Sequence, residues 1–137
     1  MNELKMILQA QLQETQKALA KLKIALQKDI QYDELYLDGI IQRFEFTFEM
    51  IWKLAKLLIN RVYEKECFSP KKCFKMLVRL KIFTDKEFLW DLANARNLTS
   101  HTYNLDYALL VYNFAKKNIS KIEALVQALE KSINDDI

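Results

Sequence analysis

The only histidine of the chain, His101, follows Arg96 by five positions in a short polar stretch. An arginine offers a permanently charged, bidentate fork for a phosphate group. A histidine titrates near neutral pH and can move a proton to or from a ribose hydroxyl. Because RNA carries its own nucleophile in the 2′-hydroxyl, such a pair needs only to orient the substrate, stabilise charge and transfer protons. These residue types therefore suit cleavage of a phosphodiester bond without a metal ion.

The spacing of the two residues limits how they can meet. On a continuous helix, positions i and i+5 point about 140° apart, so the side chains of Arg96 and His101 converge only if the chain leaves the helix between them. Residues 97–104 are rich in Asn, Thr and Ser, and this composition predicts such a loop. Taken alone, an Arg-x4-His spacing arises easily by chance, and the alternative is a helix-capping arginine and a surface histidine.

Long amphipathic segments must carry this stretch. The chain has one Gly and one Pro in 137 residues, whereas sheet proteins depend on tight turns that use both. Apolar residues recur at spacings of three and four over three long segments, at about residues 2–28, 34–65 and 105–132. Asp33 could cap the second of them. The sequence therefore predicts an all-α fold.

Two shorter helices are indicated by their starting signals. Ser69 before Pro70 is typical of an N-cap followed by proline at the first helical position, and predicts a helix that ends near residue 80. Thr84 and Glu87 have the spacing of a capping box and predict a helix that ends near Arg96. Three long and two short helices predict an antiparallel up-and-down bundle of four to five helices, as a single domain over residues 1–137.

The second long segment carries an additional apolar line beside its core stripe. This line consists of Phe46, Met50, Leu54 and Leu57. A helix that is apolar on two sides is either central or covered by a partner subunit, and exposed apolar patches usually mark interfaces. We therefore expect a homodimer.

A polar row that includes Glu45 and Glu49 separates the two apolar lines. These carboxylates could border a cleft and orient Arg96 or His101. Alternatively they belong to a solvated face, because Glu49 and Lys53 have the favourable order for an i,i+4 ion pair. The sequence leaves both interpretations open.

Charge is a weak guide to the partners of this chain. The net charge of +3 permits RNA binding without indicating it, because a dedicated nucleic-acid binder shows a basic stripe. The local basic excess could be a solvated helix face or could steer a phosphate backbone; it consists of Lys71, Lys72, Lys75, Arg79 and Lys81.

The cysteines and the N-terminus indicate in which cellular compartment the chain is expected. Cys67 and Cys73 have an x5 spacing that fits no zinc motif, and one histidine leaves few ligands for a metal site. The N-terminus lacks the apolar run of a signal peptide, and no stretch approaches the roughly 20 apolar residues of a membrane span. We expect a cytoplasmic chain without metal, cofactor or membrane contact, whose two cysteines are free thiols.

Several of these motifs together resemble the HEPN superfamily. Arg96-Asn97-x3-His101 matches its R-x4-6-H signature, and Tyr103 extends the match to R-x4-H-x-Y, the form seen in HEPN toxins paired with MNT antitoxins. The stretch at residues 38–49, followed by Trp52-Lys53, is similar to the second-helix signature of the nucleotidyltransferase substrate-binding proteins. The resemblance covers about residues 4–129.

The resemblance implies a bundle like the C-terminal helical domain of kanamycin nucleotidyltransferase, which homodimerises so that two Arg-His pairs face each other. It implies a metal-independent endoribonuclease with Arg96 and His101 as catalytic residues. Asn97 follows the arginine as a polar residue often does in this family, and we expect it to support the pair, as Glu45 and Glu49 would if they border the cleft. In toxin members, a cognate MNT nucleotidyltransferase silences the site by transferring AMP to the motif tyrosine, here Tyr103. The alternative is a non-catalytic subunit that presents substrate to the separately encoded transferase.

The chain itself lacks the residues of a nucleotidyltransferase. Such an enzyme needs a Gly-Ser turn followed by paired aspartates that hold Mg²⁺, but the sole glycine, Gly39, precedes Ile40. The aspartate pair Asp135-Asp136 stands at the C-terminal end of the sequence. Any nucleotidyl transfer must therefore come from another polypeptide.

Overall fold

The computed structural model describes residues 2–135, so Asp136 of the aspartate pair lies outside the described residues. The helices are α1 (Glu3–Ala25), α2 (Glu34–Tyr63), α3 (Pro70–Arg79), α4 (Lys86–Leu98), the short 3-10 helix η1 (Thr99–His101) and α5 (Leu105–Asp135). No strand occurs among these residues, which confirms the predicted all-α fold. No helix in this part of the chain is long and apolar enough to cross a membrane.

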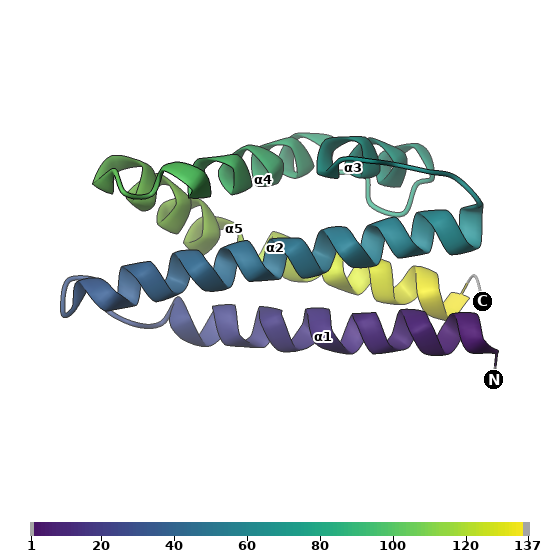
Figure 1. Ribbon diagram of the computed structural model, residues 1–137, viewed down its shortest axis with the longest axis horizontal. Helices are drawn as coiled ribbons and strands as arrows, with labels where there is room; N and C mark the ends of the chain where they lie inside the picture. Colours follow the sequence, from purple (N-terminus) through teal and green to yellow (C-terminus); the bar gives the residue numbers. More distant parts are fainter. Residues whose placement is uncertain (1, 136–137) are drawn as a thin grey trace.

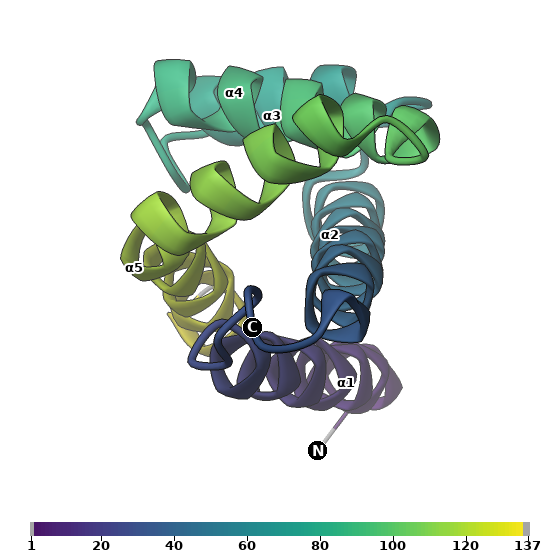
Figure 2. The ribbon, with the colours of Figure 1, turned by 90° about the vertical axis from the view of Figure 1, so that its left-hand side faces the viewer.

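The helices form three layers. The long helices α1 and α2 lie antiparallel, and α3 and α4 lie on the opposite side of α2 from α1 (Figure 1). The end-on view shows α2 and α5 as the middle layer, between α1 and the α3–α4 pair (Figure 2). Helix α4 therefore packs over α2 and α5, and the turn that joins α4 to α5 lies at one end of the bundle.

Two phenylalanines on successive turns of α2 hold the layers together. Phe44 and Phe48 are each only 1% exposed. Phe44 contacts Phe114 of α5 edge-on at 6.2 Å between ring centroids, and Phe48 contacts Phe74 of α3 in the same way at 5.7 Å. Edge-to-face pairs at such distances add to the stabilisation that burial provides. The apolar periodicity of α2 thus holds α5 beside it in the middle layer and α3 in the layer above.

Side-chain caps start the helices near the predicted positions. Ser69 accepts a hydrogen bond from the backbone N–H of Lys72, with Pro70 in the first turn, as predicted. The predicted capping box is wrong by one residue, because the N-cap of α4 is Asp85 and not Thr84. The carboxylate of Asp85 accepts from the N–H of Phe88 at 3.1 Å. A carboxylate at this position also interacts favourably with the positive end of the helix dipole.

The loop predicted for residues 97–104 is wrong in its first half. Helix α4 continues to Leu98, and the tighter helix η1 follows directly before the turn at residues 102–104. The hydroxyl of Thr99 reaches the carbonyl oxygen of Arg96 at 2.6 Å, and that of Thr102 reaches the carbonyl oxygen of Thr99 at 3.2 Å. These bonds satisfy carbonyl groups at the end of α4, so the hydroxyl residues extend the helical path here instead of ending it.

The second apolar line of α2 is only partly a surface. Leu54 is fully buried in the core of the described chain, so its assignment to the exposed line is corrected. Met50 and Leu57 are half-buried, and Phe46 is 53% exposed. The remaining patch is narrower than the sequence suggested.

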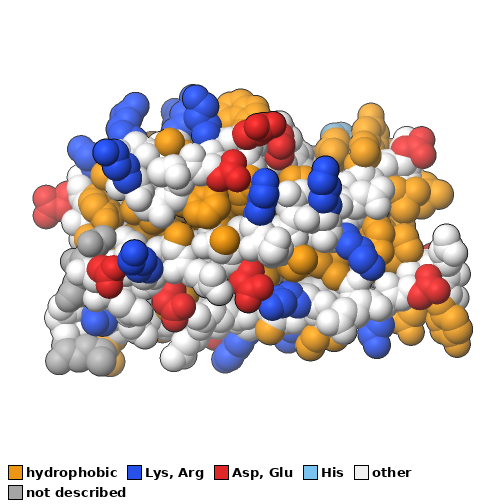
Figure 3. Space-filling model, turned by 180° about the vertical axis from the view of Figure 1, so that it is seen from behind, with side chains coloured by type: hydrophobic (Ala, Val, Ile, Leu, Met, Phe, Trp, Pro, Cys, Tyr) orange, Lys and Arg blue, Asp and Glu red, His pale blue; other side chains and the backbone are white. Residues whose placement is uncertain are grey.

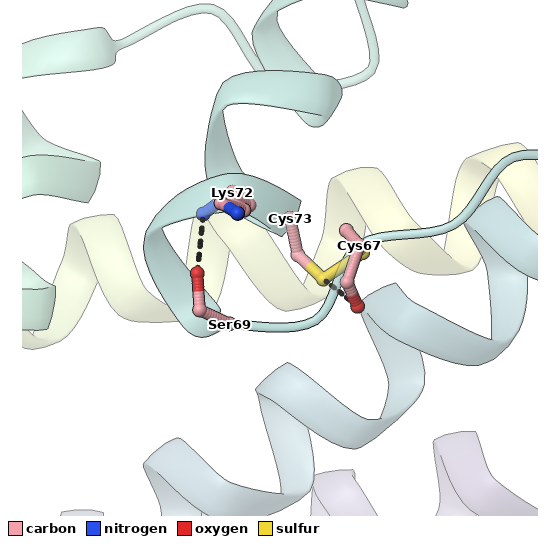
Figure 4. Close-up of a disulfide and its surroundings, with 4 residues drawn as sticks. All are labelled: Cys67, Ser69, Lys72 and Cys73. Carbon is pink, nitrogen blue, oxygen red and sulfur yellow. Dashed lines mark hydrogen bonds between the residues drawn. A yellow bond between two sulfur atoms is a disulfide. The ribbon is translucent and has the colours of Figure 1, made fainter.

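The expectation of two free thiols is wrong. Cys67, in the segment after α2, and Cys73, in the second turn of α3, form a disulfide with their Cα atoms 5.1 Å apart (Figure 4). The turn at Ser69, which caps α3, folds the chain back so that both side chains meet. The local turn brings the two thiols together. The expectation of free thiols rested only on the reducing conditions of the cytoplasm.

Candidate functional site

The guanidinium group of Arg96 is held by two carboxylates of α2. Its Nε lies 3.0 Å from Oε1 of Glu49, and its Nη1 lies 3.6 Å from Oε2 of Glu45. The two glutamates are four residues apart on one helix and therefore face the same way. Their side chains are 41% exposed, against 27% for Arg96. Both carboxylates thus contact Arg96, and among the described residues neither forms an ion pair with Lys53.

Thr99 completes this network, and the sequence analysis did not identify it. Its hydroxyl accepts a hydrogen bond from Nη1 of Arg96 at 3.0 Å and lies 2.8 Å from Oε2 of Glu45. The hydroxyl has a single proton, which it can donate either to Glu45 or to the carbonyl oxygen of Arg96. Thr99 is only 7% exposed. Its place three residues after Arg96 at a helix end was the signal that could have revealed it.

One edge of Arg96 remains open. Arginine has five N–H donors, and the contacts above use Nε and Nη1. Within residues 2–135, no group accepts a hydrogen bond from Nη2, and Nη2 is not a buried unpaired atom. The carboxylates therefore fix the plane of the guanidinium and leave the Nη2 edge for an external acceptor. They also surround one positive charge with two negative charges, so an incoming phosphate must compete with them.

His101 lies at the end of η1 with its ring exposed. The ring contacts Tyr103 edge-on and Tyr107 at a tilt, both at 6.1 Å between centroids. No hydrogen bond or ion pair within residues 2–135 involves either ring nitrogen of His101. Both nitrogens are thus available to exchange a proton with a bound molecule.

The predicted residues form two neighbouring groups. Arg96 meets Glu45 and Glu49, whereas His101 meets Tyr103. No hydrogen bond, ion pair or ring contact joins Arg96 to His101 in the described chain. Asn97, predicted to support the pair, is exposed, and its amide contacts no polar partner among the described residues.

Tyr103 is highly exposed. It lies in the turn before α5 and is 87% exposed, although its ring faces His101. By contrast, Tyr107 is 40% exposed and lies in the first turn of α5. An enzyme could reach the hydroxyl of Tyr103 without unfolding this turn.

The comparisons with known proteins agree with the resemblance noted in the sequence. The model of the family described as "Nucleotidyltransferase substrate binding protein like" matches residues 10–131, a range that contains every candidate site residue. A protein from Thermus thermophilus, known from its crystal structure, is 26% identical with a TM-score of 0.71, and the match covers 87% of this chain and 98% of that one. No curated protein sequence matches. The chain therefore belongs to the HEPN-like nucleotidyltransferase substrate-binding family.

Proposed function

We propose that the chain is the toxin of a toxin–antitoxin pair, a metal-independent endoribonuclease that uses Arg96 and His101. The observation that carries this proposal is the oriented guanidinium of Arg96, with its Nη2 edge open, one short turn before an exposed histidine. Arginine and histidine together supply what cleavage by the ribose 2′-hydroxyl needs.

The proposed reaction is an attack of the ribose 2′-hydroxyl on the adjacent phosphorus. A ring nitrogen of His101 takes the proton of the 2′-hydroxyl, and the freed oxygen forms a bond to the adjacent phosphorus. The bond from phosphorus to the 5′-oxygen breaks, and that oxygen takes a proton from a water molecule, while His101 returns the proton that it took to the solvent. Arg96 stabilises the charge that develops on the non-bridging oxygens. The products are a 2′,3′-cyclic phosphate and a 5′-hydroxyl.

Cleavage by the purified chain tests this function. We expect it to cut single-stranded RNA equally well with and without EDTA, and to leave 2′,3′-cyclic phosphate ends that mass spectrometry detects. RNA that stays intact at high protein concentration would contradict the proposal, as would activity that EDTA removes.

We further propose that Tyr103 accepts AMP from a cognate MNT nucleotidyltransferase and that this silences the site. The tyrosine oxygen would attack the α-phosphorus of ATP, losing its proton, and pyrophosphate would leave. The attached AMP would place a negative phosphate and a bulky nucleoside beside His101, whose ring already contacts Tyr103. The exposure of Tyr103 supports this assignment.

The Tyr103→Phe variant should gain no AMP when incubated with ATP, Mg²⁺ and the transferase encoded by the neighbouring reading frame. Wild type should gain AMP and lose cleavage activity, because Arg96 would be drawn to the attached phosphate instead of the RNA backbone. The loss of one such charge-assisted phosphate contact weakens RNA binding about tenfold to hundredfold. Intact mass measures the modification. Tyr107→Phe is the matched control, since this tyrosine also contacts His101, and it should be modified like wild type. Modification of Tyr103→Phe at the wild-type rate would identify another target.

We propose that two copies associate through α2, which would bring two histidines to one cleft. The exposed Phe46, with the half-buried Met50 and Leu57, supports this interface. Light scattering at micromolar concentration should give the mass of a dimer, and Phe46→Glu should give a monomer because the carboxylate would lose its hydration at the interface. A wild-type monomer would refute the interface.

A non-catalytic role is the second candidate. In this case the chain would present substrate to a separate nucleotidyltransferase, in keeping with the family name. The engagement of Arg96 by Glu45, Glu49 and Thr99 favours it, because a purely structural arginine would be bound in this way. The same cleavage experiment separates the two candidates, since only the ribonuclease cuts RNA.

A further inference from the structure

A groove of about 730 Å³ lies between α3 and α4, apart from the residues of the candidate site. Such a volume is in the range of small-molecule sites, which is about 300–1,000 Å³. Its base is apolar and includes the buried side chains of Phe74 and Leu89. Trp90 forms part of its wall with 44% of the residue exposed. A large aromatic side chain is therefore available at the surface of a hollow.

Lysines of α3 surround this indole ring. Nζ of Lys71 lies 4.1 Å from the ring centroid of Trp90, and Nζ of Lys75 lies 5.8 Å from it. The two lysines are four residues apart, so they reach the groove from the same face of α3. Both side chains are long and flexible, and the attraction between an ammonium group and an exposed ring is weak. They can therefore turn to a stronger anionic partner while another planar group takes their place on the ring.

The charge of the groove is positive overall. Besides Lys71 and Lys75, it is lined by Arg79 and Lys86. Two acidic side chains, Glu87 and Asp91, oppose these four basic ones. Lys and Arg side chains gather along the edge of the molecule that carries α3 (Figure 3). Three of these side chains, Lys71, Lys75 and Arg79, belong to the basic group that the sequence left open between a solvated face and a phosphate contact.

We propose that this groove binds a nucleotide of single-stranded RNA, with a base stacked on Trp90 and the adjoining phosphates held by Lys71, Lys75 and Arg79. Sites for single strands combine these two parts: aromatic side chains on which bases stack, and basic side chains along the backbone. The basic side chains favour a polyanionic ligand, and the exposed indole favours a polyanion with planar aromatic rings, which nucleic-acid bases supply. A fully paired duplex has no free base to stack and is excluded by the same reasoning.

The position of Trp90 places this nucleotide between one and two turns of α4 before the proposed cleavage site, and about 120° away around the helix axis. Trp90 and Arg96 are on the same helix, six residues apart, which corresponds to about 9 Å along the axis. One RNA strand can therefore occupy the groove while its next nucleotides pass Arg96 and His101. The inference extends the proposed ribonuclease by a flanking subsite, and it takes RNA as the ligand from that proposal.

Binding can be measured without cleavage. A fluorescein-labelled 2′-O-methyl oligoribonucleotide of mixed sequence lacks the 2′-nucleophile, so anisotropy reports affinity alone. We expect Trp90→Leu to weaken binding roughly 5- to 100-fold, the effect of removing one base–aromatic stack. Trp90→Phe should retain most of the affinity because it keeps an aromatic face. Lys75→Glu should weaken binding and reduce its salt dependence, whereas Lys21→Glu, the same charge change on an exposed lysine of α1, should change little.

A second measurement does not depend on variants of the groove. The chain has two tryptophans, so Trp52→Phe leaves Trp90 as the sole indole. The Nε1 atom of Trp52 is buried without a hydrogen-bond partner in the described chain, so this change removes no hydrogen bond. The oligoribonucleotide should quench the fluorescence of Trp90, and poly-glutamate and double-stranded RNA should not. Quenching by poly-glutamate alone would indicate a protein partner and overturn the proposal.

The outcomes also separate this inference from the proposed function. If Trp90→Leu binds the oligoribonucleotide with wild-type affinity and the wild-type chain cuts RNA, the proposed binding of RNA in the groove is wrong and the proposed ribonuclease stands. Binding that depends on Trp90, in a chain that cuts no RNA, would support the groove and refute the ribonuclease.

Discussion

Replacing His101 by alanine should lower the rate of RNA cleavage by about 10²- to 10⁴-fold, the contribution of one general acid or base. The fold should not change, because the ring is exposed and forms no hydrogen bond or ion pair within residues 2–135. The measurement is the initial rate of cleavage, together with the thermal unfolding midpoint of each variant.

Ser100→Ala is the matched control for this result. Ser100 is exposed and precedes His101 in the same 3-10 helix, so its replacement tests whether any change in η1 lowers the rate. We expect wild-type cleavage from it. Substantial cleavage by His101→Ala would show that another group moves the proton, and the proposed mechanism would be wrong.

Replacing Arg96 by alanine should have two separate consequences. Cleavage should fall by about 10²- to 10³-fold, as when one donor to a developing negative charge is removed. Stability should also fall, by about 1–2 kcal/mol, because Glu45 and Glu49 would lose their shared partner and repel each other one turn apart. Their partial exposure keeps this loss moderate. Urea unfolding and the cleavage rate measure the two effects on the same protein.

A triple variant separates the structural role of Arg96 from its proposed role with RNA. Glu45→Gln and Glu49→Gln keep the shape of each side chain and remove both negative charges. Combined with Arg96→Ala, they should restore most of the lost stability but none of the activity. If cleavage returned together with stability, Arg96 would matter only as the partner of the two glutamates. Arg96→Lys, which keeps the charge without the planar fork, should remain poorly active.

The helices could be predicted from the sequence because periodicity and caps are local signals. The start of α2 after Asp33 and of α3 at Pro70 were both predicted, and each cap is formed by the expected side chain. The ends of α1 and α4 were less accurate. Helix α4 was predicted to end too early because Thr and Ser are common in loops. In the structure, the hydroxyls of Thr99 and Thr102 instead form hydrogen bonds with preceding carbonyl groups.

Contacts between distant segments could be predicted only in part. The sequence raised the orientation of Arg96 by Glu45 and Glu49 as one interpretation, but it could not choose this over a solvated face, because the choice depends on how α4 crosses α2. The burial of Leu54 also depends on how neighbouring helices pack on α2. Its spacing assigns it to the second apolar line, whereas the packing places it in the core. The Cys67–Cys73 disulfide was missed for a different reason, since it follows from one tight turn.

The two carboxylates around Arg96 also affect how a charged molecule approaches this protein. They make the end of α4 locally negative, whereas the groove beside its beginning is positive overall, with four basic and two acidic side chains. We expect this field to orient an approaching polyanion so that it meets the beginning of α4 first. In the proposed ribonuclease, capture would therefore precede chemistry along one helix. Added salt slows the capture step by screening, and leaves the rate within the bound complex almost unchanged.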